Sequence, residues 1–194
     1  MREATIHRKT NETDVTVVLH IDGDGSAQVD TGVGFFDHMM CAFARFAMVK
    51  LTVHCTGDIQ VDAHHTVEDV GLCLGRAIHV ALGGKQGIRR VGQASVPMDE
   101  ALATAILDVS GRPCLVFDAA FAAPAIGAMD TQLVEDFFRA LSNTARVTLH
   151  LAVPYGRNDH HKAEALFKAF GRALDEACQT DARLRDVLST KGVL

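Results

Sequence analysis

The chain carries two copies of one pattern, and this duplication constrains its fold more than any other feature. DAHHTVEDVGLCLGRAIHVAL, starting at Asp62, aligns without gaps with NDHHKAEALFKAFGRALDEAC, starting 96 residues later at Asn158. Apolar residues in both copies recur at i, i+4, i+7, i+8 and i+11, the stripe of an amphipathic helix. The copies share two histidines, a glutamate and a Gly-Arg-Ala triplet: His64, His65, Glu68, Gly75, Arg76 and Ala77 in the first, and His160, His161, Glu164, Gly171, Arg172 and Ala173 in the second.

The duplication extends upstream of these two helices. Residues 35–46 and 133–144 share the same apolar spacing, which predicts a second helix pair. Alternating apolar and polar residues predict four strands, at 15–22, 50–54, 103–110 and 146–150. A Gly-rich stretch at 83–93 separates the halves, so we predict an α+β fold of two ββ-α-β-α half-domains, residues 1–92 and 93–194. Its two sheets and two helix pairs are expected to pack as one body.

The composition narrows the class of protein. The 194 residues hold 19 Lys and Arg against 24 Asp and Glu, a net charge of −5, which lacks the basic footprint of a nucleic-acid or membrane-surface binder. No apolar run approaches the ~20 residues of a membrane span, and the start lacks the apolar core of a secretory signal. The five cysteines form no C-x-x-C pair, which favours free thiols and a cytoplasmic location.

The doubled H-H-x-x-E spacing predicts metal binding. On a helix His64 and Glu68 share one face, as do His160 and Glu164, and this donor pair suits Zn, Mn, Fe or Ni. The second histidine of each pair, His65 or His161, lies about 100° around the helix. We therefore expect two ions, each bound by the His-x-x-x-Glu face of one repeat and the odd histidine of the other, within or between subunits. His38 is a further candidate ligand.

The sequence resembles the imidazoleglycerol-phosphate dehydratase family along its whole length. The matching stretches are TGVGFFDHM, GDIQVDAHHTVEDVGLCLG, GIRRVGQASVPMDEAL, DVSGRP, NDHHKAEALFKAFGRAL and STKGVL. The resemblance implies a duplicated fold like the second domain of ribosomal protein S5, and trimers assembled into a homo-oligomer of 24 subunits. It also implies active sites between subunits, two Mn²⁺ ions per site, and loss of water from imidazole glycerol phosphate to give imidazole acetol phosphate in histidine biosynthesis.

The resemblance also implies roles for individual residues. Glu12 matches the acid–base glutamate, which also contacts substrate, and Glu68 and Glu164 match further catalytic carboxylates. The implied phosphate-binding residues are Arg90, Arg112, Lys168, Ser189, Thr190 and Lys191. The implied metal ligands are His38, His64, His65, Glu68, Asp136, His160, His161 and Glu164. Guanidinium and ammonium groups suit a phosphate dianion, and a metal on a ring nitrogen would act as a Lewis acid.

Asp136 departs from the family pattern. The family has E-H-F-F where this chain has Glu135-Asp136-Phe137-Phe138, so aspartate takes the repeat position of His38. Aspartate is shorter, harder and charged, and the ion that it serves is expected to bind differently. An alternative hypothesis is therefore that the chain is an oligomeric metal-binding protein whose catalysis is impaired by Asp136. A two-metal hydrolase also fits the donor types but has no support from the resemblance.

Overall fold

The computed structural model describes residues 2–194 and shows the duplication as two four-stranded sheets around four helices. The first half contains β1 (Glu3–Lys9), β2 (Thr13–His20), β3 (Ala27–Asp30), α1 (Gly34–Ala47), β4 (Lys50–Gly57) and α2 (His64–Leu82). The second half contains β5 (Val91–Met98), β6 (Ala101–Asp108), β7 (Cys114–Asp118), β8 (Ala125–Ile126), β9 (Met129–Asp130), α3 (Gln132–Ala145), β10 (Thr148–Tyr155) and α4 (Asp159–Cys178). The predicted α+β fold is confirmed.

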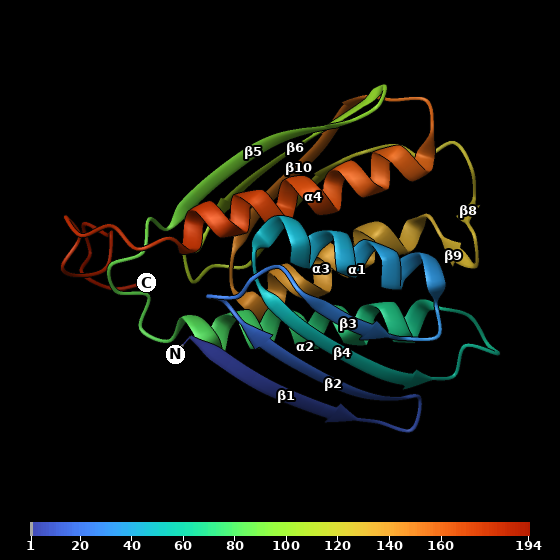
Figure 1. The fold of residues 1–194 in the computed structure, drawn as a ribbon, viewed down its shortest axis with the longest axis horizontal. Helices are drawn as coiled ribbons and strands as arrows, with labels where there is room; N and C mark the ends of the chain where they lie inside the picture. Colours follow the sequence, from blue (N-terminus) through green and yellow to red (C-terminus); the bar gives the residue numbers. More distant parts are fainter. Residues whose placement is uncertain (1) are drawn as a thin grey trace.

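The two sheets have the same topology. The strand orders are β1-β2-β4-β3 and β5-β6-β10-β7, and in each the last strand pairs parallel while the other pairs are antiparallel. Residues of β2 alternate between buried and half-buried, with Val15, Val17 and Leu19 facing the helices. The sheets form the outer layers and the helices lie between them (Figure 1). An alternating strand therefore buries one face against helices and leaves the other outward.

The helices pair across the two halves. α1 packs on α4, and α2 packs on α3, so the first helix of each half lies against the second helix of the other. Repeat-matched glycines allow this close approach. A Cβ on Gly171 would lie 2.8 Å from the carbonyl oxygen of Phe43, and one on Gly75 would lie 2.3 Å from that of Leu141. Both positions are therefore confined to glycine by the backbone of the crossing helix.

Aromatic rings join the halves into one core. Phe43 of α1 stacks on Phe170 of α4 at 5.3 Å between ring centroids, and Phe36 of α1 meets Phe137 of α3 edge-on at 5.3 Å. Phe167 of α4 stacks on Phe137 at 5.2 Å. Because the contacts of Phe43 with Phe170 and of Phe36 with Phe137 join the two halves, neither half has a separate core.

The structure extends the predicted ββ-α-β-α order. Each half has a third strand before its first helix, β3 or β7, and β8 and β9 form an additional short hairpin. These strands have four or five residues and weak apolar alternation, so periodicity does not mark them. β5 begins at Val91, two residues before the predicted boundary, and Arg146 ends α3 in a left-handed conformation rather than starting a strand. No helix in residues 2–194 has the length and apolarity that a bilayer crossing requires.

Candidate metal centre

Side-chain caps fix the starts of the two histidine-bearing helices. Asn158 accepts hydrogen bonds through Oδ1 from the backbone N–H groups of His160, at 2.9 Å, and His161, at 3.3 Å. At the matching position of the first repeat, Asp62 Oδ1 accepts from the N–H of His64 at 2.7 Å. Asn and Asp satisfy the free N–H groups of a first helical turn in this way. Both histidine pairs therefore sit on the first turns of α2 and α4.

The first candidate cluster joins α1 to α4. One ligand atom each from His38, His160 and Glu164 lies within 4.8 Å of the others. Glu164 Oε2 is 3.5 Å from His38 Nε2 and 3.2 Å from His160 Nε2. Although burial alone would raise the pKa of Glu164, the Lys168 ammonium and His38 hold that pKa below its usual value. The cluster thus presents two imidazoles and an ionised carboxylate, a donor set that suits a divalent transition ion.

The second candidate cluster joins α3 to α2. His64 Nδ1 lies 3.9 Å from Asp136 Oδ2, and Glu68 follows one turn later on α2. His64 and Asp136 line a cavity of about 420 Å³. Asp136 also binds Arg139 on its own helix, with Nη1 3.2 Å from Oδ1. The second cluster therefore repeats the arrangement of the first, with aspartate in place of His38 and a looser spacing.

The second histidine of each pair points away from these clusters. Ring planes within the pairs are inclined by 82°, for His64 with His65 and for His160 with His161. His65 Nδ1 lies 3.1 Å from Asp58 Oδ2, and His161 Nδ1 lies 2.7 Å from Glu100 Oε2.

These carboxylates tune the outward-facing rings. The contact with Asp58 raises the pKa of His65, and the contact with Glu100 raises that of His161. A carboxylate that accepts from Nδ1–H fixes the tautomer of the ring and leaves Nε2 free to coordinate a metal ion. This is the usual arrangement around metal-binding histidines. Neither ring joins a ligand cluster within residues 2–194.

Glu12 lies in the turn between β1 and β2, beside His65 at the start of α2. Its Oε1 is 3.8 Å from His65 Nε2, and its side chain is 54% exposed. A groove of about 300 Å³ runs beside it, lined by Thr56, Gly57, Asp58 and other residues. The structure thus places the predicted acid–base residue next to a predicted metal ligand of the same chain.

Lys168 lies beside the first cluster rather than in a separate anion site. Its Nζ is 2.6 Å from Glu164 Oε1 and 3.4 Å from the sulfur of Met98, and it sits 5.2 Å from the centre of the Phe46 ring. In the structure this cation neutralises the buried carboxylate of the cluster.

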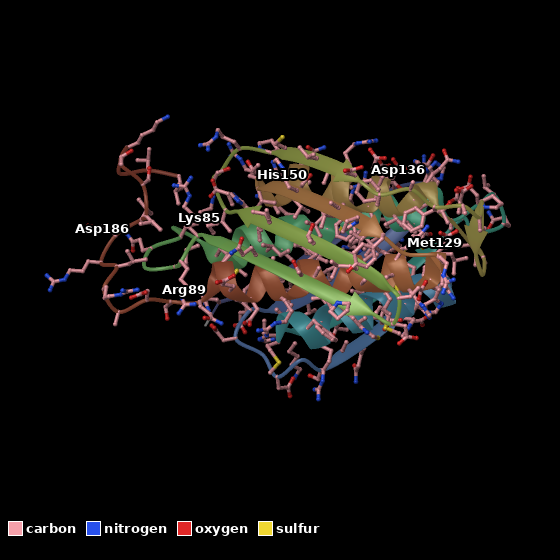
Figure 2. The ribbon with its side chains drawn as sticks, turned by 90° about the horizontal axis from the view of Figure 1, so that it is seen from above. Lys85, Arg89, Met129, Asp136, His150 and Asp186 are labelled. Atoms are coloured by element: carbon pink, nitrogen blue, oxygen red, sulfur yellow. The ribbon has the colours of Figure 1, made fainter. Side chains whose placement is uncertain are left out.

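The other predicted phosphate-binding residues lie at the opposite end of the molecule. The backbone N–H of Arg90 donates to the carbonyl of Ala177 near the end of α4, at 2.9 Å. Because an α-helix rises about 1.5 Å per residue, Ala177 lies ~24 Å along α4 from His161. Figure 2 shows the same separation, with Lys85 and Arg89 at one end and Asp136 near the other.

The residues at that end are linked to one another by hydrogen bonds. Arg90 binds Asp108 through two nitrogens, at 2.6 and 2.9 Å, and donates to the carbonyl of Leu188 at 2.6 Å. This contact ties down the C-terminal segment that carries Ser189, Thr190 and Lys191. Arg112 lies in the loop between β6 and β7, and its carbonyl accepts from Oγ1 of Thr148, the first residue of β10, at 3.2 Å. Apart from Lys168, the predicted phosphate-binding residues of one chain therefore lie far from its predicted metal ligands.

Sequence reasoning missed Asp58 and Glu100 as partners of the outward histidines. Repeat matching could not find them, because Asp58 follows β4 of the first half whereas Glu100 lies in the turn between β5 and β6 of the second. Their equivalence arises only when the sheets place both loops beside the helix starts.

The chain is similar to known proteins in both sequence and fold. A family model described as imidazoleglycerol-phosphate dehydratase matches residues 31–174. The chain is similar to the imidazoleglycerol-phosphate dehydratases of Acetivibrio thermocellus, 55% identical with 100% of this chain and 99% of that protein covered, and of Symbiobacterium thermophilum, 56% identical with 100% and 93% covered. The crystal structure of the enzyme from Staphylococcus aureus matches with a TM-score of 0.84 and 36% identity over 92% of this chain and 99% of that one. The structure from Pyrococcus furiosus, in complex with (S)-C348, matches with a TM-score of 0.83 and 33% identity over 97% and 100%.

Proposed function

Since the chain belongs to the imidazoleglycerol-phosphate dehydratase family, the hydro-lyases of histidine biosynthesis, we propose its reaction in detail. It removes water from D-erythro-imidazole glycerol phosphate to give imidazole acetol phosphate, with two Mn²⁺ ions per active site. The observation that carries this proposal is the pair of repeat-related clusters at the starts of α2 and α4, with Glu12 beside His65 of α2.

The donor atoms present fit divalent metal ions. His38, His160 and Glu164 would hold one ion, and His64, Glu68 and Asp136 would hold the other, each with imidazole nitrogen and carboxylate oxygen. Bound to the substrate imidazole, such ions supply Lewis acidity that lets the ring accept negative charge. His65 and His161, whose Nδ1 atoms contact Asp58 and Glu100, are proposed to complete the sites of neighbouring subunits through Nε2.

Glu12 is the proposed proton carrier. Its carboxylate lies at the surface beside His65 Nε2, where a bound imidazole ring would be held next to it. A carboxylate in this place can take the weakly acidic hydrogen beside the ring and return a proton to the departing hydroxyl. Glu68 and Glu164 serve the reaction as ligands.

The separation of ~24 Å along α4 between Arg90 and the histidines supports a shared active site. We propose that Arg90, Arg112 and the segment Ser189–Lys191 of one subunit bind the phosphate at a metal centre of another. Lys168 would also bind the phosphate once a metal ion replaces it as the partner of Glu164. This arrangement requires a homo-oligomer, for which we propose 24 cytoplasmic subunits built from trimers, without nucleic-acid or membrane partners.

A direct assay tests the proposal. The purified protein is stripped of metal, reloaded with Mn²⁺ and supplied with imidazole glycerol phosphate, and imidazole acetol phosphate is measured together with the mass of the particle. Product that depends on Mn²⁺ supports the proposal. Release of inorganic phosphate would indicate a two-metal hydrolase, and metal binding without product would favour the metal-binding protein impaired by Asp136.

A further inference from the structure

The turn that carries Glu12 is held by hydrogen bonds within the turn itself. We call β1, β2 and the residues between them the Glu12 hairpin. Thr10 Oγ1 accepts from the N–H groups of Glu12, at 3.1 Å, and Thr13, at 3.0 Å, while the N–H of Thr10 donates to the carbonyl of Thr13 at 2.8 Å. The tip is therefore a closed turn whose position depends on what the hairpin packs against.

A buried carboxylate fastens this hairpin to α2. Asp69 follows Glu68 on α2 and is 4% exposed. Its Oδ2 accepts hydrogen bonds from the Thr13 hydroxyl and from Arg8 Nη1, on the two strands of the hairpin. Because α2 also carries His64, His65 and Glu68, one helix sets the positions of both the predicted ligands and the hairpin.

The second half lacks this contact. Ala165 takes the repeat position of Asp69, so α4 has no carboxylate at this place. There Glu100 makes the link itself, accepting from the N–H groups of Arg157 and Asn158 at 3.0 and 2.7 Å and contacting His161.

The β1–β2 and β5–β6 turns are thus held in place by different carboxylates. The Glu100 carboxylate is occupied in holding its turn, since it accepts from two backbone N–H groups and contacts His161. In the first half Asp69 holds the turn, and the Glu12 side chain has no hydrogen-bond partner among residues 2–194. Glu12 therefore has a fixed backbone and a free carboxylate.

We propose that Asp69 and Thr13 are positioning residues that hold the Glu12 hairpin against α2 and so keep the Glu12 carboxylate beside His65. This inference rests on the proposed function, in which Glu12 transfers the proton. Its physical basis is that small displacements of a reacting group lower the rate strongly, by about 100-fold for 1 Å.

Substitution of Thr13 tests the proposal. Thr13→Val removes the hydroxyl but keeps the side-chain shape, and Arg8 continues to satisfy Asp69. We expect kcat to fall about tenfold or more, with KM and bound Mn²⁺ unchanged, and Thr13→Ser to restore most of the rate. Asp14→Asn is the matched control, since Asp14 lies on the same hairpin but pairs only with the exposed His7 and Lys9. An unchanged kcat in Thr13→Val would overturn the proposal.

A double-mutant cycle separates positioning from general stability. If Thr13 acts through Glu12, Thr13→Val should leave the residual rate of Glu12→Gln unchanged. An equal loss of rate in the wild-type and Glu12→Gln proteins would overturn the proposal. Asp69→Asn gives a second test in the same cycle, with the same expected result.

Hydrogen exchange tests the hairpin without any activity. In the Mn²⁺-loaded particle the amides of Asn11, Glu12 and Thr13 should exchange about tenfold faster in Thr13→Val, and as in wild type in Asp14→Asn. Unchanged exchange in Thr13→Val overturns the positioning role. Absence of product with the wild-type protein, by contrast, overturns the proposed function alone.

Discussion

Single residues make the two candidate metal clusters chemically different. The first has His38 beside a glutamate that Lys168 neutralises, whereas the second has Asp136 beside His64. Asp136 adds a negative charge and an oxygen donor, and Arg139 draws it partly toward its own helix. The first cluster should therefore prefer borderline ions such as Zn²⁺ more strongly than the second, which favours harder ions such as Mn²⁺.

Replacing Asp136 with histidine should raise metal affinity at the second cluster. We expect Asp136→His to bind Zn²⁺ about tenfold or more tightly, the range over which changes around a metal site usually act. Metal content per chain after dialysis against a graded chelator measures this. Asp130→His is the control, since Asp130 lines the same cavity outside the cluster. Equal metal retention in wild type and Asp136→His would remove Asp136 from the ligands.

At the scale of elements, the start of α4 is fastened by a buried ion pair. Asp159 and Lys162 are each 8% exposed, and Lys162 Nζ donates to Asp159 Oδ1 at 2.8 Å. Asp159 Oδ2 also accepts from the N–H groups of Ala122 and Ala123 at 2.9 and 2.6 Å. The loop after β7 is thereby held against the turn that presents His160 and His161.

This ion pair gives a pH-dependent contribution to stability. Burial alone would raise the pKa of Asp159, but Lys162 and the two N–H groups hold it below the usual value of 3.8. A depressed carboxyl pKa stabilises the fold above that value, and the contribution is lost as pH falls through the folded-state pKa.

We expect Asp159→Asn to lower the free energy of unfolding by about 3 kcal/mol at neutral pH, because Lys162 loses its buried partner. The difference should persist near pH 5 and shrink below about pH 3.8. Urea unfolding of both metal-free proteins across this range measures it. A difference that does not depend on pH would show that the charge of Asp159 is unimportant.

The helix crossings give a second prediction for elements. Gly171→Ala would place a methyl group against the backbone of α1, 2.8 Å from the Phe43 carbonyl oxygen and 3.0 Å from the nitrogen of Ala47. We expect a loss of about 2 kcal/mol in the free energy of unfolding. Gly34→Ala is the matched control, since a Cβ there meets no atom within 4 Å. It should be neutral or stabilising by about 0.5 kcal/mol. Equal urea midpoints for both variants would contradict the close crossing.

The whole molecule is interlocked rather than built from two independent halves. Each first helix packs on the second helix of the other half, and the phenylalanine core is shared. Both candidate clusters therefore also draw ligands from both halves, His38 with Glu164 and His64 with Asp136.

We expect residues 1–90 alone to show no cooperative unfolding transition. Isolation would expose Phe36 and Phe43 of α1, both fully buried in the intact chain, to water. Circular dichroism during thermal unfolding measures this, and addition of residues 91–194 should restore the transition. A cooperative, monomeric fragment would show that the half is a domain by itself.

The sequence alone determined the repeated elements and the chemistry of the motif. Residues such as Leu74 and Phe170 repeat at helical spacing because one face of each helix must be buried, so periodicity predicted α2 and α4 correctly. The 100° rotation between neighbours likewise predicted that His64 and His65 would diverge. Both are local consequences of backbone geometry, which needs no knowledge of tertiary contacts.

Only the tertiary structure decided which residues meet. That His38 faces Glu164, that Asp69 holds the Glu12 hairpin and that Arg90 lies far from the histidines follow from packing between segments distant in sequence. The short strands β3 and β7 also depend on the tertiary structure, because their hydrogen bonds to β4 and β10 define them more than their own residues do. Sequence spacing fixes neighbours along one element, whereas proximity between elements depends on how their buried faces pack together.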